Sequence, residues 1–247
     1  MLKYAVEGQQ NERLLVFVNG AGVSKWMWRY QKSFAAEYKC IFFDLPGHGD
    51  NSNIDFSSIE EVSHQITQLI EKESISGQAV VIGHSIGAQI TLDLMKSYRN
   101  YLTKAVIISG LNHPLKTLRR LVKPTIALSM PLIKSKSFAK MQFKQFGLPQ
   151  IWFEDYYQDS LKISRTTLTN ISLSNLSFDF SQTVADLPVL ILVGEQEKSI
   201  MKKSAYKTAS FLPNSQLLMI KSAGHGIPYE QPEQFNDLLN GFLDLII

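Results

Sequence analysis

Short apolar runs recur along the chain at intervals that suit the strands of a parallel sheet. Each run is continuous in hydrophobicity, as expected for a strand that is covered on both faces. Helical patterns separate most of the runs, and this alternation predicts an α/β fold with a mostly parallel, doubly wound sheet. The runs lie at residues 14–18, 41–45, 79–82, 105–108, 189–193 and 216–220.

The clearest helical pattern lies at residues 57–74. Its apolar side chains recur at helical spacing and share one face, while glutamates, Gln68 and Lys72 occupy the opposite face. This helix is expected to cover the sheet. Two closing helices are expected at residues 200–211 and, after Pro232, at residues 233–247.

The alternation stops at residues 111–187, a stretch too long for an ordinary crossover between strands. Prolines divide the stretch into short pieces, and its aromatic density is high. We therefore expect a helical cap at residues 111–187, inserted into a core formed by residues 1–110 and 188–247. Most of the aromatics should form the core of the cap, and some are candidates for a substrate pocket. The pocket candidates are Phe146, Trp152, Phe153 and Tyr156.

Composition is ordinary for a globular enzyme, with 45% hydrophobic and 19% charged residues among 247. The N-terminal stretch lacks the apolar core of a signal peptide, and no apolar run reaches the roughly 18 residues of a membrane span. These features favour a cytoplasmic protein without membrane insertion. The single cysteine, Cys40, lies in an apolar run, where a buried inert thiol is expected.

The formal net charge of +3 is small for a nucleic-acid-binding protein, so no nucleic acid partner is expected. The excess of positive charge falls in residues 111–187, with 10 Lys+Arg against 5 Asp+Glu. A solvated lysine-rich surface is the favoured interpretation. Recognition of an anionic group, such as a phosphate or a coenzyme A tail, by lysines 134, 136, 140 and 144 is the alternative.

The most informative motif is Gly-His-Ser-Ile-Gly at residues 83–87, between the apolar run 79–82 and a helical pattern at residues 88–98. A serine on a tight strand-to-helix turn is exposed above the strand end, and the turn demands small neighbours such as Gly83 and Gly87. The context predicts that Ser85 is a nucleophile.

An exposed serine needs a base and an acid that orients the base. His225 is the best candidate for the base, because it follows the last apolar run on a glycine-rich loop. Glu197 is the preferred acid, because it lies where the run 189–193 gives way to a loop, and strand ends gather catalytic groups in α/β sheets. Glu195 is the rival.

An oxyanion requires two amide donors. The N–H group of Ile86, directly after the serine, is one candidate, and the loop at residues 19–22 (Asn-Gly-Ala-Gly) offers the other. That loop lacks the spacing of a phosphate-binding glycine loop.

The remaining histidines lack the paired spacing of a metal site, so no metal and no cofactor are expected. His48 is expected to support a loop, His84 to pack at the serine turn, His64 to lie on an amphipathic helix and His113 to open the cap, where it could border the pocket.

Several of these segments together resemble the α/β-hydrolase superfamily, over about residues 14–109 and from residue 189 to the C-terminus. The resemblance is carried by residues 83–87, by residues 44–49 (Asp-Leu-Pro-Gly-His-Gly) and by residues 223–228 (Ala-Gly-His-Gly-Ile-Pro) with Glu230, Pro232 and Phe235.

The resemblance implies a triad of Ser85, Glu197 and His225, in the family's order of nucleophile, acid and histidine. It also implies that the amides of Ala21 and Ile86 form the oxyanion hole. Two departures stand out, because many members have His-Gly where this chain has Asn19-Gly20, and the usual acid is aspartate. A serine nucleophile disfavours haloalkane dehalogenases and epoxide hydrolases, which use aspartate there.

The leading hypothesis is a serine hydrolase that cleaves a carboxylic ester or thioester with an apolar portion through an acyl-enzyme. A second hypothesis keeps the triad for carbon–carbon bond hydrolysis, perhydrolysis or a lyase reaction. A third is a non-catalytic small-molecule sensor that acts through a protein partner. In each case the ligand is a small molecule, and the pattern defines no oligomeric state.

Overall fold

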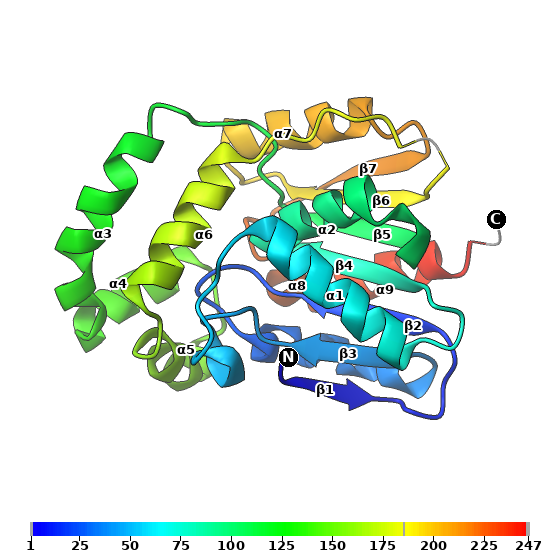
Figure 1. Cartoon of the computed structure of the whole chain (residues 1–247), viewed down its shortest axis with the longest axis horizontal. Helices are drawn as coiled ribbons and strands as arrows, with labels where there is room; N and C mark the ends of the chain where they lie inside the picture. The colour runs from blue at the N-terminus through cyan, green and yellow to red at the C-terminus, as the bar shows by residue number, and fades with distance from the viewer. Residues whose placement is uncertain (1, 185, 246–247) are drawn as a thin grey trace.

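A sheet of seven strands forms the centre of the computed structural model, which describes residues 2–184 and 186–245 (Figure 1). The strand order is β1-β3-β2-β4-β5-β6-β7, in which β1 is antiparallel to β3 and the other neighbours are parallel. This confirms the predicted mostly parallel sheet. The strands are β1 (Tyr4–Glu7), β2 (Leu14–Val18), β3 (Lys39–Phe43), β4 (Ala79–His84), β5 (Leu102–Ile108), β6 (Val189–Gly194) and β7 (Ser215–Ile220).

Helices cover both faces of the sheet, as its strand composition predicts. In β2, Leu14, Val16 and Val18 pack into the core on the side of α1, α2 and α7, whereas Leu15 and Phe17 pack on the side of η1 and α9. The covering helices are η1 (Lys25–Ala36), α1 (Ile59–Glu73), α2 (Ile86–Ser97), α7 (Ser199–Ser210) and α9 (Pro232–Leu243). Short helices η2 (Gly49–Asn51), η3 (Arg99–Tyr101) and α8 (Ile227–Glu230) connect them.

The predicted helix at residues 57–74 corresponds to α1. The Ser58 hydroxyl caps it by accepting a hydrogen bond of 3.2 Å from the Glu61 N–H group. Acidic residues occupy the first turn and Lys72 the last, which complements the helix dipole.

Among the strands and the helices that cover the sheet, two have no counterpart in the sequence prediction. The first is β1, an edge strand of four half-buried residues that lacks the continuous hydrophobicity of the central strands. The second is η1, a 3₁₀ segment with a kink at Trp28 (φ −91°, ψ 17°), whose side chains pack against the sheet. The conformation of both elements depends on packing against distant parts of the chain more than on a local hydrophobic pattern.

The closing helix was predicted to extend to Ile247, and α9 instead ends at Leu243. The buried Lys104 Nζ donates hydrogen bonds of 2.8–2.9 Å to the carbonyls of Phe242, Leu243 and Leu245. These bonds satisfy carbonyls that a longer helix would use internally. The last two residues of the predicted helix, 246 and 247, lie outside the described residues.

An insertion of helices follows β5 and precedes β6, at the end of the sheet where the parallel strands finish (Figure 1, left). Its helices are α3 (Arg119–Ile133), α4 (Lys136–Gln145), η4 (Gln150–Trp152), α5 (Phe153–Ser160) and α6 (Arg165–Ser177). Among the described residues, no helix is both long and apolar enough to cross a membrane.

Asn112 joins the start of this insertion to its end. Its buried amide donates hydrogen bonds to the Phe180 carbonyl (3.0 Å) and to Thr208 Oγ1 (3.2 Å), and its Oδ1 accepts one from the Phe180 N–H group (2.7 Å). One side chain therefore ties both ends of the insertion to α7.

We expect Asn112→Ala to lower the free energy of unfolding by about 2–4 kcal/mol, because it leaves buried main-chain groups of Phe180 without partners. Urea unfolding followed by circular dichroism measures this change. The matched control is Asn53→Ala, at an exposed asparagine. Equal stability of the two variants would contradict the role of Asn112.

Candidate active site

Ser85 occupies a strained turn between β4 and α2. Its main chain has φ 58° and ψ −115°, a conformation that non-glycine residues rarely adopt. The strain is held by hydrogen bonds from the Ser85 N–H group to the Ile108 carbonyl (2.9 Å) and from the Ala88 N–H group to the Ser85 carbonyl (3.0 Å). The turn presents the serine side chain at the carboxyl end of the sheet.

Two glycines make this turn possible because three main-chain segments meet there. A Cβ atom on Gly83 would collide with the Gly87 carbonyl, and one on Gly87 would collide with the Val18 carbonyl at the end of β2. The loop after β2 also lies close to the serine, since a Cβ on Gly20 would come within 3.3 Å of Ser85 Cβ. The small residues of the motif therefore bring the loop at residues 19–22 against the turn.

Glu197 and His225 come together from the loops after β6 and β7. His225 Nδ1 and Glu197 Oε1 are 2.9 Å apart, and the Glu197 side chain is only 6% exposed. Glu195 points elsewhere, since its Oε2 accepts a hydrogen bond of 3.1 Å from the Ser222 N–H group. The structure thus places Glu197, and not Glu195, on the imidazole.

Glu230 braces the loop that carries His225, a contact that the sequence did not predict. Its carboxylate accepts hydrogen bonds from the N–H groups of Gly224 (2.6 Å) and Gly226 (2.9 Å), on either side of the histidine. The feature of the sequence that could have indicated this contact is a carboxylate five residues after a histidine that glycines flank. This bidentate contact fixes a segment that its glycines would otherwise leave flexible.

His84, which precedes the serine, is bonded to the same loop. Its Nε2–H group donates to the His225 carbonyl (2.8 Å), and the two imidazole rings lie 4.9 Å apart. Burial and the neighbouring His225 together lower the pKa of His84 to about 3, although the bond to the carbonyl opposes this shift. His84 is therefore a neutral donor that links the serine turn to the histidine loop.

Side chains also hold the loop at residues 19–22. Asn19 Nδ2 donates to the carbonyls of Gly20 (3.0 Å) and Val23 (2.6 Å), and the Gly22 N–H group donates to His48 Nε2 (3.0 Å). Burial lowers the pKa of His48, which favours the neutral ring. Because Nε2 accepts the bond from Gly22, the ring proton lies on Nδ1, which faces the Pro46 carbonyl. Asn19 therefore supports this loop from within it.

The N–H groups of Ala21 and Ile86 donate to no acceptor in the part of the chain that the structure describes. Ile86 begins α2, so its amide is one of the unpaired donors at a helix N-terminus. Both amides are available to an anionic oxygen.

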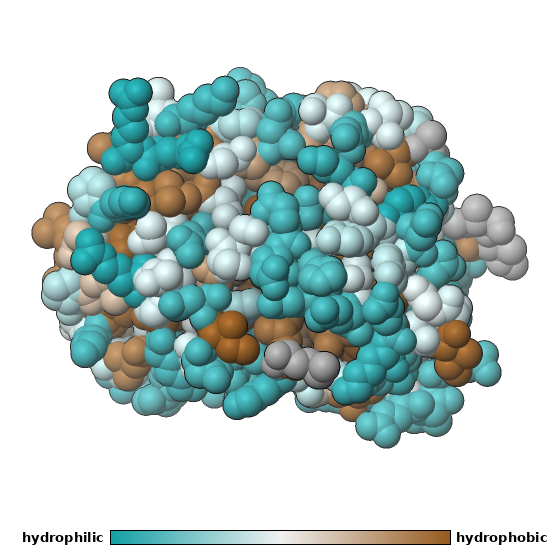
Figure 2. Space-filling view, viewed as in Figure 1, coloured by the Kyte–Doolittle hydropathy of each residue, from teal (hydrophilic) through white to brown (hydrophobic). Residues whose placement is uncertain are grey.

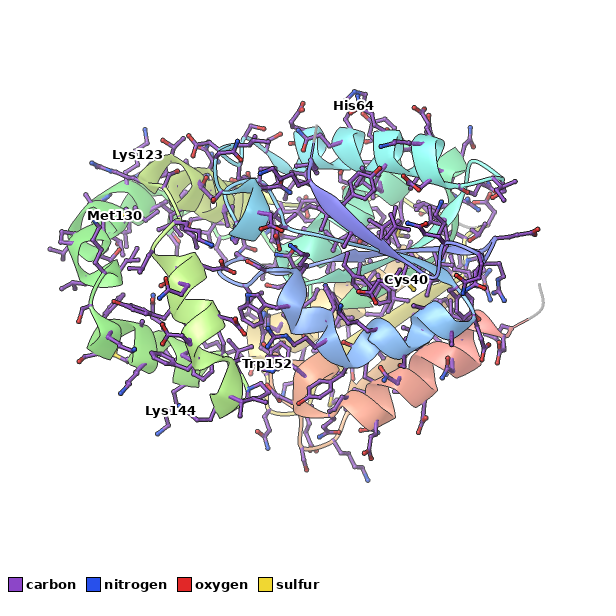
Figure 3. All side chains as sticks on the ribbon, turned by 90° about the horizontal axis from the view of Figure 1, so that it is seen from below. Cys40, His64, Lys123, Met130, Lys144 and Trp152 are labelled. Atoms are coloured by element: carbon purple, nitrogen blue, oxygen red, sulfur yellow. The ribbon has the colours of Figure 1, made fainter. Side chains whose placement is uncertain are left out.

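A cavity of about 260 Å³ lies beside this loop, beneath the insertion. Ala21 and Gly22 form one wall, and Phe146 and Tyr156 are among the side chains that line the rest. Trp152 and Phe153 are buried but do not line this cavity. Trp152 packs against Trp26, and Phe153 stacks on Tyr157 (Figure 3, Trp152). His113 is exposed.

Within residues 2–184 and 186–245, no group of three or more His, Cys, Asp or Glu side chains could hold a metal ion. Cys40 is buried in β3, and burial raises the pKa of its thiol to about 12. Ser85 Oγ and His225 form no hydrogen bond with each other among these residues. Such catalytic bonds often tighten only when substrate binds.

Comparisons with known proteins identify the family and the fold. The sequence model of the alpha/beta hydrolase family matches residues 15–238. The chain is 23% identical to the dihydrolipoyllysine-residue acetyltransferase component of the acetoin cleaving system of Pseudomonas putida, over 98% of this chain and 66% of that protein. The chain spans 18–68% of the lengths of the first four curated relatives that it matches.

Solved structures share the fold. A thermophilic esterase from Thermogutta terrifontis has a TM-score of 0.81 at 20% identity, with 98% of this chain and 92% of that chain covered. A bromoperoxidase from Bacillus anthracis has a TM-score of 0.82 at 20% identity, with 98% and 95% covered.

The low pKa of His84 gives a testable pH dependence. An unfolded histidine has a pKa of about 6.5, whereas folded His84 has a pKa of about 3. Between these pH values the unfolded chain binds a proton at residue 84 and the folded chain does not, so the folded state loses stability as the pH falls. The contribution of His84 to the free energy of unfolding is complete above pH ~6.5. It should fall by about 2 kcal/mol by pH ~5. Urea unfolding of the wild type and of His84→Asn at both pH values measures it, and an unchanged pH slope in the variant would contradict the assignment.

Proposed function

Because the chain belongs to the alpha/beta hydrolase family, we propose that it is a serine hydrolase that cleaves a carboxylic ester or thioester with an apolar acyl portion. The proposal rests on one observation: the strained turn of Ser85 and the histidine bound by Glu197 lie at the same end of the sheet. Ser85 follows β4, and the 2.9 Å contact between Glu197 and His225 lies on neighbouring loops.

The proposed nucleophile is Ser85, with His225 as its base. In the proposed first step, His225 Nε2 takes the hydroxyl proton while Ser85 Oγ attacks the substrate carbonyl. The Glu197 carboxylate accepts a hydrogen bond from His225 Nδ1–H, which selects the tautomer with a free Nε2. It also stabilises the imidazolium that forms, and its low exposure strengthens that interaction.

The amides of Ala21 and Ile86 are proposed to bind the oxyanion of the tetrahedral intermediate. Neither N–H group has a protein acceptor among the described residues, so neither must break a bond to do so. The loop bonds made by Asn19 and His48 hold the Ala21 amide in place before substrate arrives. Collapse of the intermediate expels the alcohol or thiol, which receives the proton from His225. Water then resolves the acyl-enzyme by the reverse sequence.

The cavity beside the oxyanion loop indicates the character of the acyl group. Its lining includes Ile126, Ile133 and Ile171 together with neutral polar side chains, and no Asp, Glu, Lys, Arg or His. A charged acyl group would lose its hydration there without a partner. At about 260 Å³ the cavity exceeds the ~150 Å³ that holds benzene and is below the range of drug-sized sites. A neutral acyl chain of short to medium length fits it.

The kinetic test compares three variants on a p-nitrophenyl ester. Ser85→Ala should lower kcat by about 10⁶-fold, and Glu197→Gln by about 10⁴-fold. Glu195→Gln is the matched control and should stay within about twofold of the wild type, because Glu195 does not contact His225. Equal loss in both glutamate variants would reassign the acid, and full activity of Ser85→Ala would rule out the mechanism.

A series of p-nitrophenyl esters and matched thioesters tests the acyl group. The value of kcat/KM should rise from acetyl to an intermediate chain that fills the cavity and fall for long chains. Ser172→Phe, on the cavity wall, should shift the optimum to shorter chains. A flat profile that Ser172→Phe leaves unchanged would show that the acyl group lies elsewhere.

A further inference from the structure

One end of the molecule combines exposed leucines with an uninterrupted excess of positive charge. Residues 111–153 contain no Asp or Glu. They contain eight cations: Lys116, Arg119, Arg120, Lys123, Lys134, Lys136, Lys140 and Lys144. Figure 3 shows Lys123, Met130 and Lys144 along the end of the molecule that the insertion forms.

Most of these cations have no partner in the part of the chain that the structure describes. Lys136 and Lys140 are the exceptions, because each lies within 6 Å of an aromatic ring of α5. All eight are exposed, and among the described residues only Lys136 has an ion-pair partner, Glu154 at 3.1 Å. The acidic residues of the insertion all follow residue 153, and Asp155 instead pairs with Arg29 of η1. The end of the molecule formed by α3 and α4 therefore has a concentration of positive charge that is exposed to solvent.

Apolar side chains are exposed at the same end of the molecule, on the side of α3 opposite Lys123. Leu121, Leu128 and Leu132 of α3 are 57%, 78% and 48% exposed, and their spacing of seven and four places them on one stripe of the helix. Isolated exposed leucines are common in soluble proteins, but three on one stripe form a patch. Figure 2 shows brown patches among teal at the end where Figure 1 places α3.

Helix α3 faces the substrate cavity on its other side. Ile126, Ser129 and Ile133 line the cavity, and Val122 and Ile126 are buried against the rest of the protein. One helix therefore separates the proposed acyl site from the leucine stripe.

We propose that the end of the molecule formed by α3 and α4, with its leucine stripe and its exposed cations, is a docking surface for an anionic lipid bilayer. The leucines enter the boundary between headgroups and acyl chains, and the cations pair with lipid phosphates and carboxylates. Charge complementarity argues for this occupant over a second copy of the chain, because two such surfaces would repel each other. The helix lies in the interface and does not cross the bilayer, which agrees with its length.

Docking would place the wall of the acyl cavity against the source of amphiphilic esters. That consequence rests on the proposed hydrolase function, whereas the docking itself does not. The experiment therefore measures binding first, with the whole chain and with Ser85→Ala, which should bind equally well. Loss of turnover together with intact binding would refute the hydrolase and leave the docking surface standing.

Sedimentation with phosphatidylcholine vesicles, with or without phosphatidylserine, tests the docking. The protein should bind the anionic vesicles and dissociate as salt screens the charges. Lys123→Glu with Lys144→Glu should weaken binding by more than about tenfold. Lys203→Glu with Lys221→Glu, an equal change of charge outside the insertion, should alter it by less than about threefold.

The leucine stripe is tested by Leu128→Ser, which should weaken vesicle binding by about tenfold. Ile75→Ser is its matched control, because Ile75 is 82% exposed but lies outside the insertion, and it should bind as the wild type does. Thermal melting of each variant shows that the fold is retained. Absence of binding to anionic vesicles would overturn the proposal. So would a dimer that Leu128→Ser dissociates without any vesicle binding.

Discussion

The close approach of three main-chain segments around Ser85 is the constraint on which the site depends. Strand β4, the start of α2 and the end of β2 meet where Gly83 and Gly87 leave no room for side chains. At that approach the serine has a positive φ, and the Ile86 N–H group at the start of α2 has no acceptor among the described residues. The same approach brings the loop at residues 19–22 beside the serine. The strain at one residue thus gathers the nucleophile and both proposed oxyanion donors.

Hydrogen bonds from three side chains then carry this geometry to the rest of the site. His84 links the serine turn to the His225 carbonyl, and Glu230 holds the amides on either side of His225. His48 does the same for Gly22 in the loop after β2. Burial keeps His84 and His48 uncharged, so they position main chain without adding positive charge beside the proposed base.

Elements with a strong local signal could be predicted from the sequence. The central strands are buried on both faces and show continuous hydrophobicity, and the Gly-His-Ser-Ile-Gly motif encodes its own turn. The edge strand β1 and the kinked η1 were missed, because pairing and packing partners far along the chain define them. The brace from Glu230 was missed for the same reason. His48 was expected to support a loop, but its partner Gly22, in the loop after β2, was not predicted. The sequence could not predict which aromatic residues line the cavity either. Phe146 lines it and Trp152 is buried elsewhere, but the sequence around the two residues does not distinguish them.

The proposed role of Ser85 is tested most directly by covalent labelling with a fluorophosphonate, which reacts with a serine that a histidine activates. Intact mass and peptide mapping should find one adduct per chain, on Ser85, formed rapidly by the wild type. The adduct should form far more slowly in His225→Ala, because that variant lacks the base that takes the hydroxyl proton. An adduct elsewhere, or equal labelling of both proteins, would contradict the claim that the turn at Ser85 presents an activated nucleophile.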